Sequence, residues 1–169
     1  HLKIKTRMPV VIFTPKSLLH HPMVLSKVEE LSNGSFNEII DDNMVKPSSI
    51  EKIIFTSGRL YYDLHKHQVE NGIKNVAIVR LEQIYTIPKD QINRIIKKYK
   101  NSTELIWAQD EPENMGAWPF LNRKLPELGL KVVSRPESAS PAVGLMEKHL
   151  RGLEKILNAV FEQKEVVAS

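Results

Sequence analysis

Short runs of apolar, mostly β-branched residues alternate with helix-like segments along this chain, and that order leaves few folds open. The runs lack the polar alternation of a strand with one wet face, and they lie at residues 10–13, 53–55, 76–79, 105–108 and 130–133. Such runs are typical of strands buried on both faces of a parallel sheet. The pattern therefore predicts a three-layer α/β fold, a five-stranded, mostly parallel sheet with helices on both faces.

The segments between the runs carry helix signals. Apolar spacing and stop residues such as Asn33-Gly34 and Gly72 predict helices over 24–31, 59–71, 88–99, 117–128 and 143–161, with Pro126 interrupting or ending the fourth. Residues 35–51, which contain Asp41-Asp42 and Pro47-Ser48-Ser49, are expected to form a connecting loop over the surface.

Length and composition limit how many domains the chain can form and which kinds of functional site it can contain. The 169 residues predict a single domain, 1–169, and the absence of cysteine excludes disulfides, thiolate metal sites and a cysteine nucleophile. A net charge of +4 is mild for a nucleic-acid-binding protein, and no apolar run is long enough to span a membrane. Because residue 1 is His, not Met, and the basic residues Lys3, Lys5 and Arg7 lead directly into an apolar run, we expect a fragment of a longer polypeptide.

Two basic groups are candidate anion sites. Ser57-Gly58-Arg59 falls between a predicted strand and a predicted helix, where backbone N–H groups and Arg59 could hold a phosphate or carboxylate. A tight turn relieved by glycine explains the same residues. Arg7, Lys16 and Ser17 gather around the first apolar run and could hold an anion, or they form a solvated basic rim.

We expect no catalytic, cofactor-binding or metal-ligating residue in this chain. The polar stretch 109–113 follows the fourth apolar run, where α/β sheets build sites, but its carboxylates lack a nucleophile or metal ligand nearby and suit a solvated loop. The six histidines show no metal-ligand spacing, and the serines of 134–140 lack a nucleophile elbow.

Taken together, five phrases resemble the carboxyl-terminal domain of the E1 component of 2-oxoglutarate dehydrogenases. In chain order they are RMPVVIFTPKSLL (7–19), TSGRLYYDL (56–64), VAIVRLEQIY (76–85), DEPENMGAW (110–118) and RPESASPAVG (135–144). Five residues depart from the family pattern, which has Arg at His20, Lys at Arg59, Pro at Thr86, Glu at Asp110 and Gln at Met115. His20 and Met115 weaken polar roles at those two positions.

The resemblance implies a transketolase carboxyl-terminal-like domain. By this resemblance, the whole enzyme is expected to be a homodimer that needs thiamine diphosphate and Mg²⁺, whose ligands lie in preceding E1 domains in that family. It decarboxylates 2-oxoglutarate in the citric acid cycle and passes the succinyl group to the lipoyl arm of its dihydrolipoyl succinyltransferase E2 partner. The expected compartment is the bacterial cytoplasm or the mitochondrial matrix.

The resemblance leaves the role of this domain open. It could support assembly with the preceding domains and a second E1 subunit, in a 2-oxoglutarate or a related 2-oxoadipate enzyme. Some relatives bind AMP or acetyl-CoA, so the candidate contacts for a regulatory nucleotide are Arg7, Lys16, Ser17 and Arg59. A ligand-sensing module and a stand-alone flavodoxin-like binding domain are the alternatives.

Overall fold

The computed structural model describes Val11 and residues 15–162, and the chain forms two compact units, His1–Ser35 and Phe36–Ser169. The described part of the first unit contains η1 (Lys16–Leu18), η2 (Pro22–Val24) and α1 (Val28–Asn33). None of its described side chains is buried.

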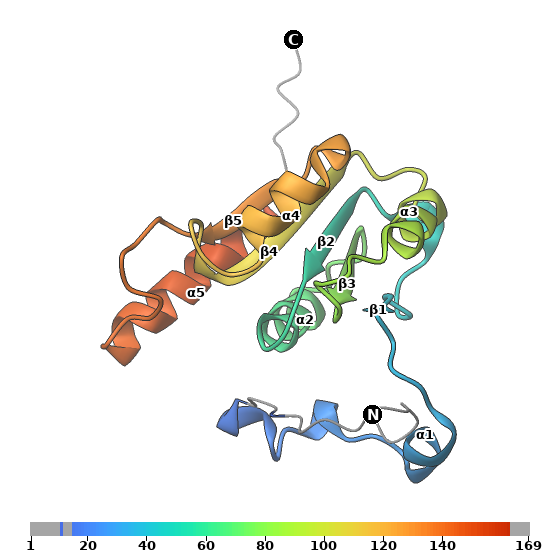
Figure 1. Cartoon of the computed structure of the whole chain (residues 1–169), viewed down its shortest axis with the longest axis horizontal. Coiled ribbons are helices and arrows are strands. Elements are labelled where there is room, and N and C mark those ends of the chain that lie inside the picture. Colours follow the sequence, from blue (N-terminus) through green and yellow to red (C-terminus); the bar gives the residue numbers. More distant parts are fainter. Residues whose placement is uncertain (1–10, 12–14, 163–169) are drawn as a thin grey trace. The chain divides into compact units, whose positions relative to one another are not determined.

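The second unit holds a five-stranded sheet in the order β1-β3-β2-β4-β5 (Figure 1). Its strands are β1 (Ile39–Ile40), β2 (Lys52–Thr56), β3 (Val76–Leu81), β4 (Glu104–Pro112) and β5 (Lys131–Arg135). The edge strand β1 is antiparallel to β3, and the other neighbouring strands are parallel. Its helices are α2 (Leu60–Glu70), α3 (Lys89–Lys98), α4 (Trp118–Lys124) and α5 (Met146–Phe161), with short turns η3 (Pro47–Ser49) and η4 (Pro126–Leu128).

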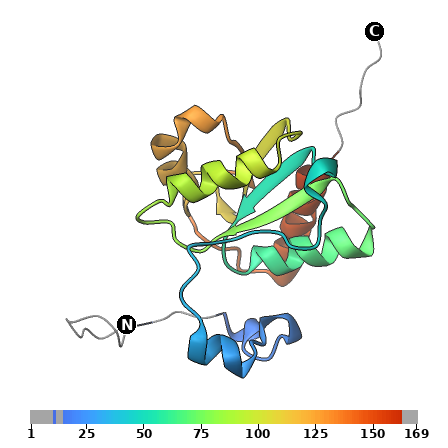
Figure 2. The ribbon, with the colours of Figure 1, turned by 90° about the vertical axis from the view of Figure 1, so that its right-hand side faces the viewer.

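The helices cover both faces of the sheet (Figure 2). Successive strand side chains point to opposite faces, so Ile53 and Phe55 of β2 pack in the α3/α4 layer, whereas Ile54 packs in the α2/α5 layer. Both layers are apolar, which explains why the central strands read as unbroken apolar runs. The predicted α/β class, with a five-stranded, mostly parallel sheet between two helix layers, is confirmed.

The identity of one sheet strand differs from the prediction. Val11, the one described residue of the apolar run at 10–13, is 77% exposed and lies outside any strand. The other residues of that run lie outside the described part of the chain. The fifth strand is β1, inside the segment expected to be a loop, so that expectation is wrong for Ile39–Ile40.

Polar contacts made by the acidic residues after β1 explain the difference. Asp41 accepts a 2.8 Å hydrogen bond from the Tyr99 hydroxyl, and Asp42 accepts one of 3.1 Å from the Ile78 backbone N–H. These carboxylates therefore hold the edge strand to the sheet instead of marking a solvated loop. No helix in the described part of the chain is long and apolar enough to cross a membrane.

Candidate functional site

A polar cluster lies at the carboxyl edge of the sheet, on the α2/α5 face. Residues two apart on a strand share a face. Each strand from β2 to β5 has one residue packed in the α2/α5 layer and a polar residue two positions later. The packed residues are Ile54, Ile78, Ala108 and Val133, and the polar residues on the same face are Thr56, Arg80, Asp110 and Arg135. In open α/β sheets, ligands bind outside the carboxyl ends of the strands. The cluster therefore occupies the position in this fold that favours a ligand.

Two buried atoms in the cluster lack hydrogen-bond partners. Among the described residues they are Thr56 Oγ1 and Arg80 Nε, and Thr56 is fully buried. The two residues are register partners on the parallel strands β2 and β3. Buried polar atoms are nearly always paired, and leaving one unpaired costs about 1–3 kcal/mol. These two unpaired groups lie side by side at the carboxyl edge of the sheet.

The rest of the Arg80 guanidinium is held by aromatic and acidic neighbours. Its Cζ lies 4.5 Å from the centroid of the Tyr61 ring, and its Nη1 donates a long 3.5 Å hydrogen bond to the Tyr62 hydroxyl. Its Nε is 3.8 Å from Glu82 Oε1, which is an ion pair but not a hydrogen bond. Burial raises the pKa of Tyr61, while the Arg80 charge partly opposes that rise.

Arg135 is fixed by several hydrogen bonds at the end of β5. Its Nε donates to the Asp110 carbonyl oxygen at 2.8 Å, and its Nη2 donates to Asp110 Oδ1 at 2.6 Å and to the His149 carbonyl oxygen at 3.3 Å. A Cβ built on Gly152 would lie 1.9 Å from Arg135 Nη1. Glycine in the middle of α5 therefore makes the space that the guanidinium fills.

The start of α2 brings a further ion pair to this edge. Arg59 precedes the helix, and its Nε lies 3.8 Å from Asp63 Oδ2. Burial raises the pKa of the Asp63 carboxyl, and the Arg59 charge opposes this rise while Asp110 adds to it. Arg59 is the predicted anion-site residue that belongs to this cluster.

The other predicted anion-site residues lie elsewhere in the chain. Lys16 and Ser17 are exposed on η1 in the first unit, whereas Arg59 belongs to the second. Arg7 lies outside the described residues. The four-residue nucleotide site therefore stays a prediction.

The predicted polar loop after the fourth run is partly structural. β4 continues through Pro112, and buried Gln109 accepts hydrogen bonds from Trp107 Nε1 (2.8 Å) and the Trp118 N–H (3.0 Å). Its Nε2 donates to the carbonyl oxygens of Pro112 (3.0 Å) and Met115 (2.8 Å). Gln109 thus closes the turn between β4 and α4.

Sequence reasoning missed Thr56, Arg80 and Arg135 as members of one cluster. Each is a polar residue at or near the end of an apolar run, and that placement is the signal that could have found them. Within the described residues, no group of three histidine, aspartate or glutamate side chains is placed to hold a metal ion.

Comparisons with known proteins identify the relatives of this chain. The family model described as 2-oxoglutarate dehydrogenase C-terminal matches residues 25–161. The 2-oxoglutarate dehydrogenase E1 component of Rickettsia felis is 44% identical over 162 residues, and that of Haemophilus influenzae is 37% identical over 159. Each match covers 90% of this chain, but only 16% and 17% of the respective relative.

A solved structure titled as a split-gene transketolase, an inactive β4 tetramer, is similar over 65% of this chain and 38% of its own, with a TM-score of 0.48 and 13% identity. The family assignment rests on the sequence matches, which span most of the chain and include all four helices and five strands of the second unit. The chain belongs to the 2-oxoglutarate dehydrogenase C-terminal family.

Proposed function

We propose that residues 1–169 are the carboxyl-terminal, non-catalytic domain of a 2-oxoglutarate dehydrogenase E1. The observation that carries this proposal is the family match over 25–161, together with relatives of which the chain spans about one sixth. In this proposal the whole E1 decarboxylates 2-oxoglutarate and hands the succinyl group to its dihydrolipoyl succinyltransferase E2 partner. The domain supports assembly with the preceding E1 domains and the second E1 subunit. A 2-oxoadipate enzyme is the alternative.

Thiamine diphosphate and Mg²⁺ belong to the preceding domains in this proposal. In this proposal, the domain itself supplies no catalytic group to the cofactor. The matched relatives named above are bacterial proteins, which favours the cytoplasm over the mitochondrial matrix.

A chimeric enzyme tests the proposal. The segment of Rickettsia felis E1 that matches residues 25–161 is replaced by this chain's own, and 2-oxoglutarate decarboxylation is measured. We expect a dimer that keeps its activity and its KM for 2-oxoglutarate. The matched control carries the Haemophilus influenzae segment, which comes from an E1 component. A folded, dimeric chimera without activity, beside an active control, would contradict the proposal.

A second function is favoured by the unpartnered atoms at the carboxyl edge. We propose that this domain senses a nucleotide, AMP or acetyl-CoA. The candidate phosphate contacts are Arg7, Lys16 and Ser17 of the first unit and Arg59 of the second. Arg59 stands beside the edge at which buried Thr56 Oγ1 and Arg80 Nε lack partners among the described residues. Guanidinium groups suit phosphate because they donate two parallel hydrogen bonds.

Calorimetric titration with AMP and acetyl-CoA tests this second function. We expect binding to weaken in Arg7→Ala and Arg59→Ala, and to stay unchanged in Lys124→Ala, an exposed cation on α4 that serves as the control. Titrating a chimeric E1 that carries residues 1–161 of this chain, and so includes Arg7, Lys16 and Ser17, covers a site that neighbouring domains complete. Absent binding in both proteins, or equal loss in the Lys124 control, would refute the nucleotide role.

A further inference from the structure

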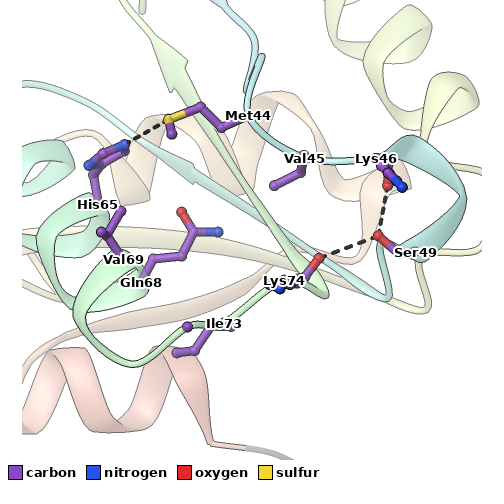
Figure 3. A pocket seen from close by; sticks show the side chains of 10 residues that line it. Met44, Val45, Lys46, Ser49, His65, Gln68, Val69, Ile73 and Lys74 are labelled. Atoms are coloured by element: carbon purple, nitrogen blue, oxygen red, sulfur yellow. Dashed lines mark hydrogen bonds between the residues drawn. The ribbon is translucent and has the colours of Figure 1, made fainter.

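An apolar pocket lies away from the carboxyl-edge cluster, between α2 and the segment that links β1 to η3 (Figure 3). It has a volume of about 570 Å³. Its lining residues are Met44, Val45, Lys46, Ser49, His65, Gln68, Val69, Gly72, Ile73 and Lys74. Pockets of this size with apolar walls and a few convergent polar groups are typical of small-molecule sites.

The pocket walls include apolar side chains that no described residue covers. Met44 is 76% exposed and Val69 is 58% exposed, although both line the pocket together with half-buried Ile73. The Met44 thioether lies 3.3 Å from His65 Nε2, which holds the side chain beside the pocket mouth (Figure 3). Covering such surface with an aliphatic chain is favourable, and a flexible methionine adapts to its shape.

The lining includes two lysines without acidic partners among the described residues. Lys46 and Lys74 are exposed, and neither has an ion pair with another described residue. No residue in the lining carries a carboxylate. The buried Gln68 amide is already used, because its Nε2 donates to the Val76 carbonyl oxygen at 2.8 Å. The lysines therefore set the charge that a ligand would meet.

Ser49 fixes the spacing of the two cationic segments. Its Oγ lies 2.9 Å from the carbonyl oxygen of Lys46 and 3.4 Å from that of Lys74, and it can donate to either (Figure 3). The two lysine-bearing segments are thus joined at the pocket whether or not a ligand is present. Lysine stems can lie along apolar surface while their charged ends stay in water, so both segments can offer an ammonium group to an anionic head group at the pocket.

We propose that this pocket binds an amphipathic carboxylate, a small molecule with an aliphatic chain and one anionic head. The chain lies against Met44, Val69 and Ile73, and the carboxylate meets Lys46 and Lys74. The proposal is independent of the nucleotide role, because its residues are distinct from Arg59 and from the carboxyl-edge cluster.

Octanoate is the probe, and methyl NMR of ¹³C-methionine in the 169-residue chain is the readout. Methionines stand at 8, 23, 44, 115 and 146, and of the four that the structure describes, Met44 lines the pocket. We expect a saturable shift of the Met44 methyl with octanoate, little shift with acetate, and weaker binding of 1-octanol. Val69→Trp, at an exposed helix position, fills the pocket without changing charge and should abolish the shift.

Paired lysine variants separate a specific head-group contact from diffuse attraction. Lys46→Ala/Lys74→Ala should weaken octanoate at least about tenfold. The matched control, Lys97→Ala/Lys100→Ala, removes the same charge from exposed positions at the end of α3 and should bind as the wild type does. The proposal is overturned by a missing Met44 shift, by 1-octanol binding as tightly as octanoate, or by equal weakening in both double variants. Binding of an acidic peptide but not octanoate would also overturn it.

Discussion

Replacing Gly152 with alanine should destabilise this protein, although the same change in an ordinary helix stabilises it. Gly152 lies in the interior of α5, where alanine is favoured over glycine by about 1 kcal/mol. The new Cβ would lie 1.9 Å from Arg135 Nη1 and 2.9 Å from Cζ, so the guanidinium must move. Its bonds to Asp110 and His149 resist that movement.

The expected cost follows from the contacts that Arg135 would lose. A hydrogen bond to a charged group contributes about 1.5–3 kcal/mol, and the Arg135 side chain is only 12% exposed. Asp110 is 37% exposed, so water recovers part of the loss. After subtracting the gain in helix propensity, we expect Gly152→Ala to lower the free energy of unfolding by about 0.5–2 kcal/mol.

Urea denaturation followed by fluorescence of Trp107 and Trp118, both in the second unit, measures the effect. The control is the same substitution in an Arg135→Met background, where the guanidinium is absent and Gly152→Ala should stabilise by up to about 1 kcal/mol. The sign of the effect thus depends on Arg135. Stabilisation by Gly152→Ala in both backgrounds would refute the reasoning.

Three further substitutions test other contacts. Gln109→Leu leaves the polar groups around the β4–α4 turn without hydrogen-bond partners. Urea denaturation should therefore show a free energy of unfolding lower by about 3–5 kcal/mol, and a decrease under 1 kcal/mol would contradict this. Tyr99→Phe removes the hydroxyl that donates a hydrogen bond to Asp41. Amide hydrogen exchange at β1 should therefore become faster than in the wild type, while exchange at α5 stays the same; a β1 exchange rate equal to that of the wild type would contradict this. Glu104→Gln should lower the free energy of unfolding by about 1–3 kcal/mol at pH 7, and this difference from the wild type should vanish as pH falls.

The pH dependence at Glu104 has a definite sign. Burial favours the protonated carboxyl, but the Lys131 hydrogen bond and the Lys52 charge outweigh it and hold the pKa of Glu104 below its ordinary value of 4.5. The unfolded chain therefore binds the proton more readily, and the stabilisation is present above pH 4.5 and lost as pH falls through the lower folded pKa. A difference between wild type and Glu104→Gln that stays constant down to acid pH would contradict this.

Local sequence patterns were enough to predict the central sheet and most helices. Unbroken apolar runs mark β2, β3 and β4, because those strands are buried on both faces. The edge strand β1 was not predicted, because two residues carry almost no periodic signal. Its place in the sheet depends on pairing with Leu81 and Arg80, which lie far along the chain. Strand pairing of that kind is a tertiary effect that local pattern does not contain.

The candidate site was predictable only where its signal is local. Arg59 stood out because Ser57-Gly58 separates a strand from a helix within the sequence itself. Thr56 and Arg80 meet through the parallel register of β2 and β3, which is set by packing of the whole sheet. Gly152 shows the same limit, because the reason for glycine is a guanidinium on another element.

The most direct test of the central proposal is a decarboxylation assay on the 169-residue chain alone. Radiolabelled 2-oxoglutarate is supplied with thiamine diphosphate and Mg²⁺, and released carbon dioxide is compared with that from full-length Rickettsia felis E1. A non-catalytic carboxyl-terminal domain predicts release no faster than in buffer, while the full-length enzyme turns over. Sustained release by the chain alone, abolished when thiamine diphosphate is withheld, would contradict the account.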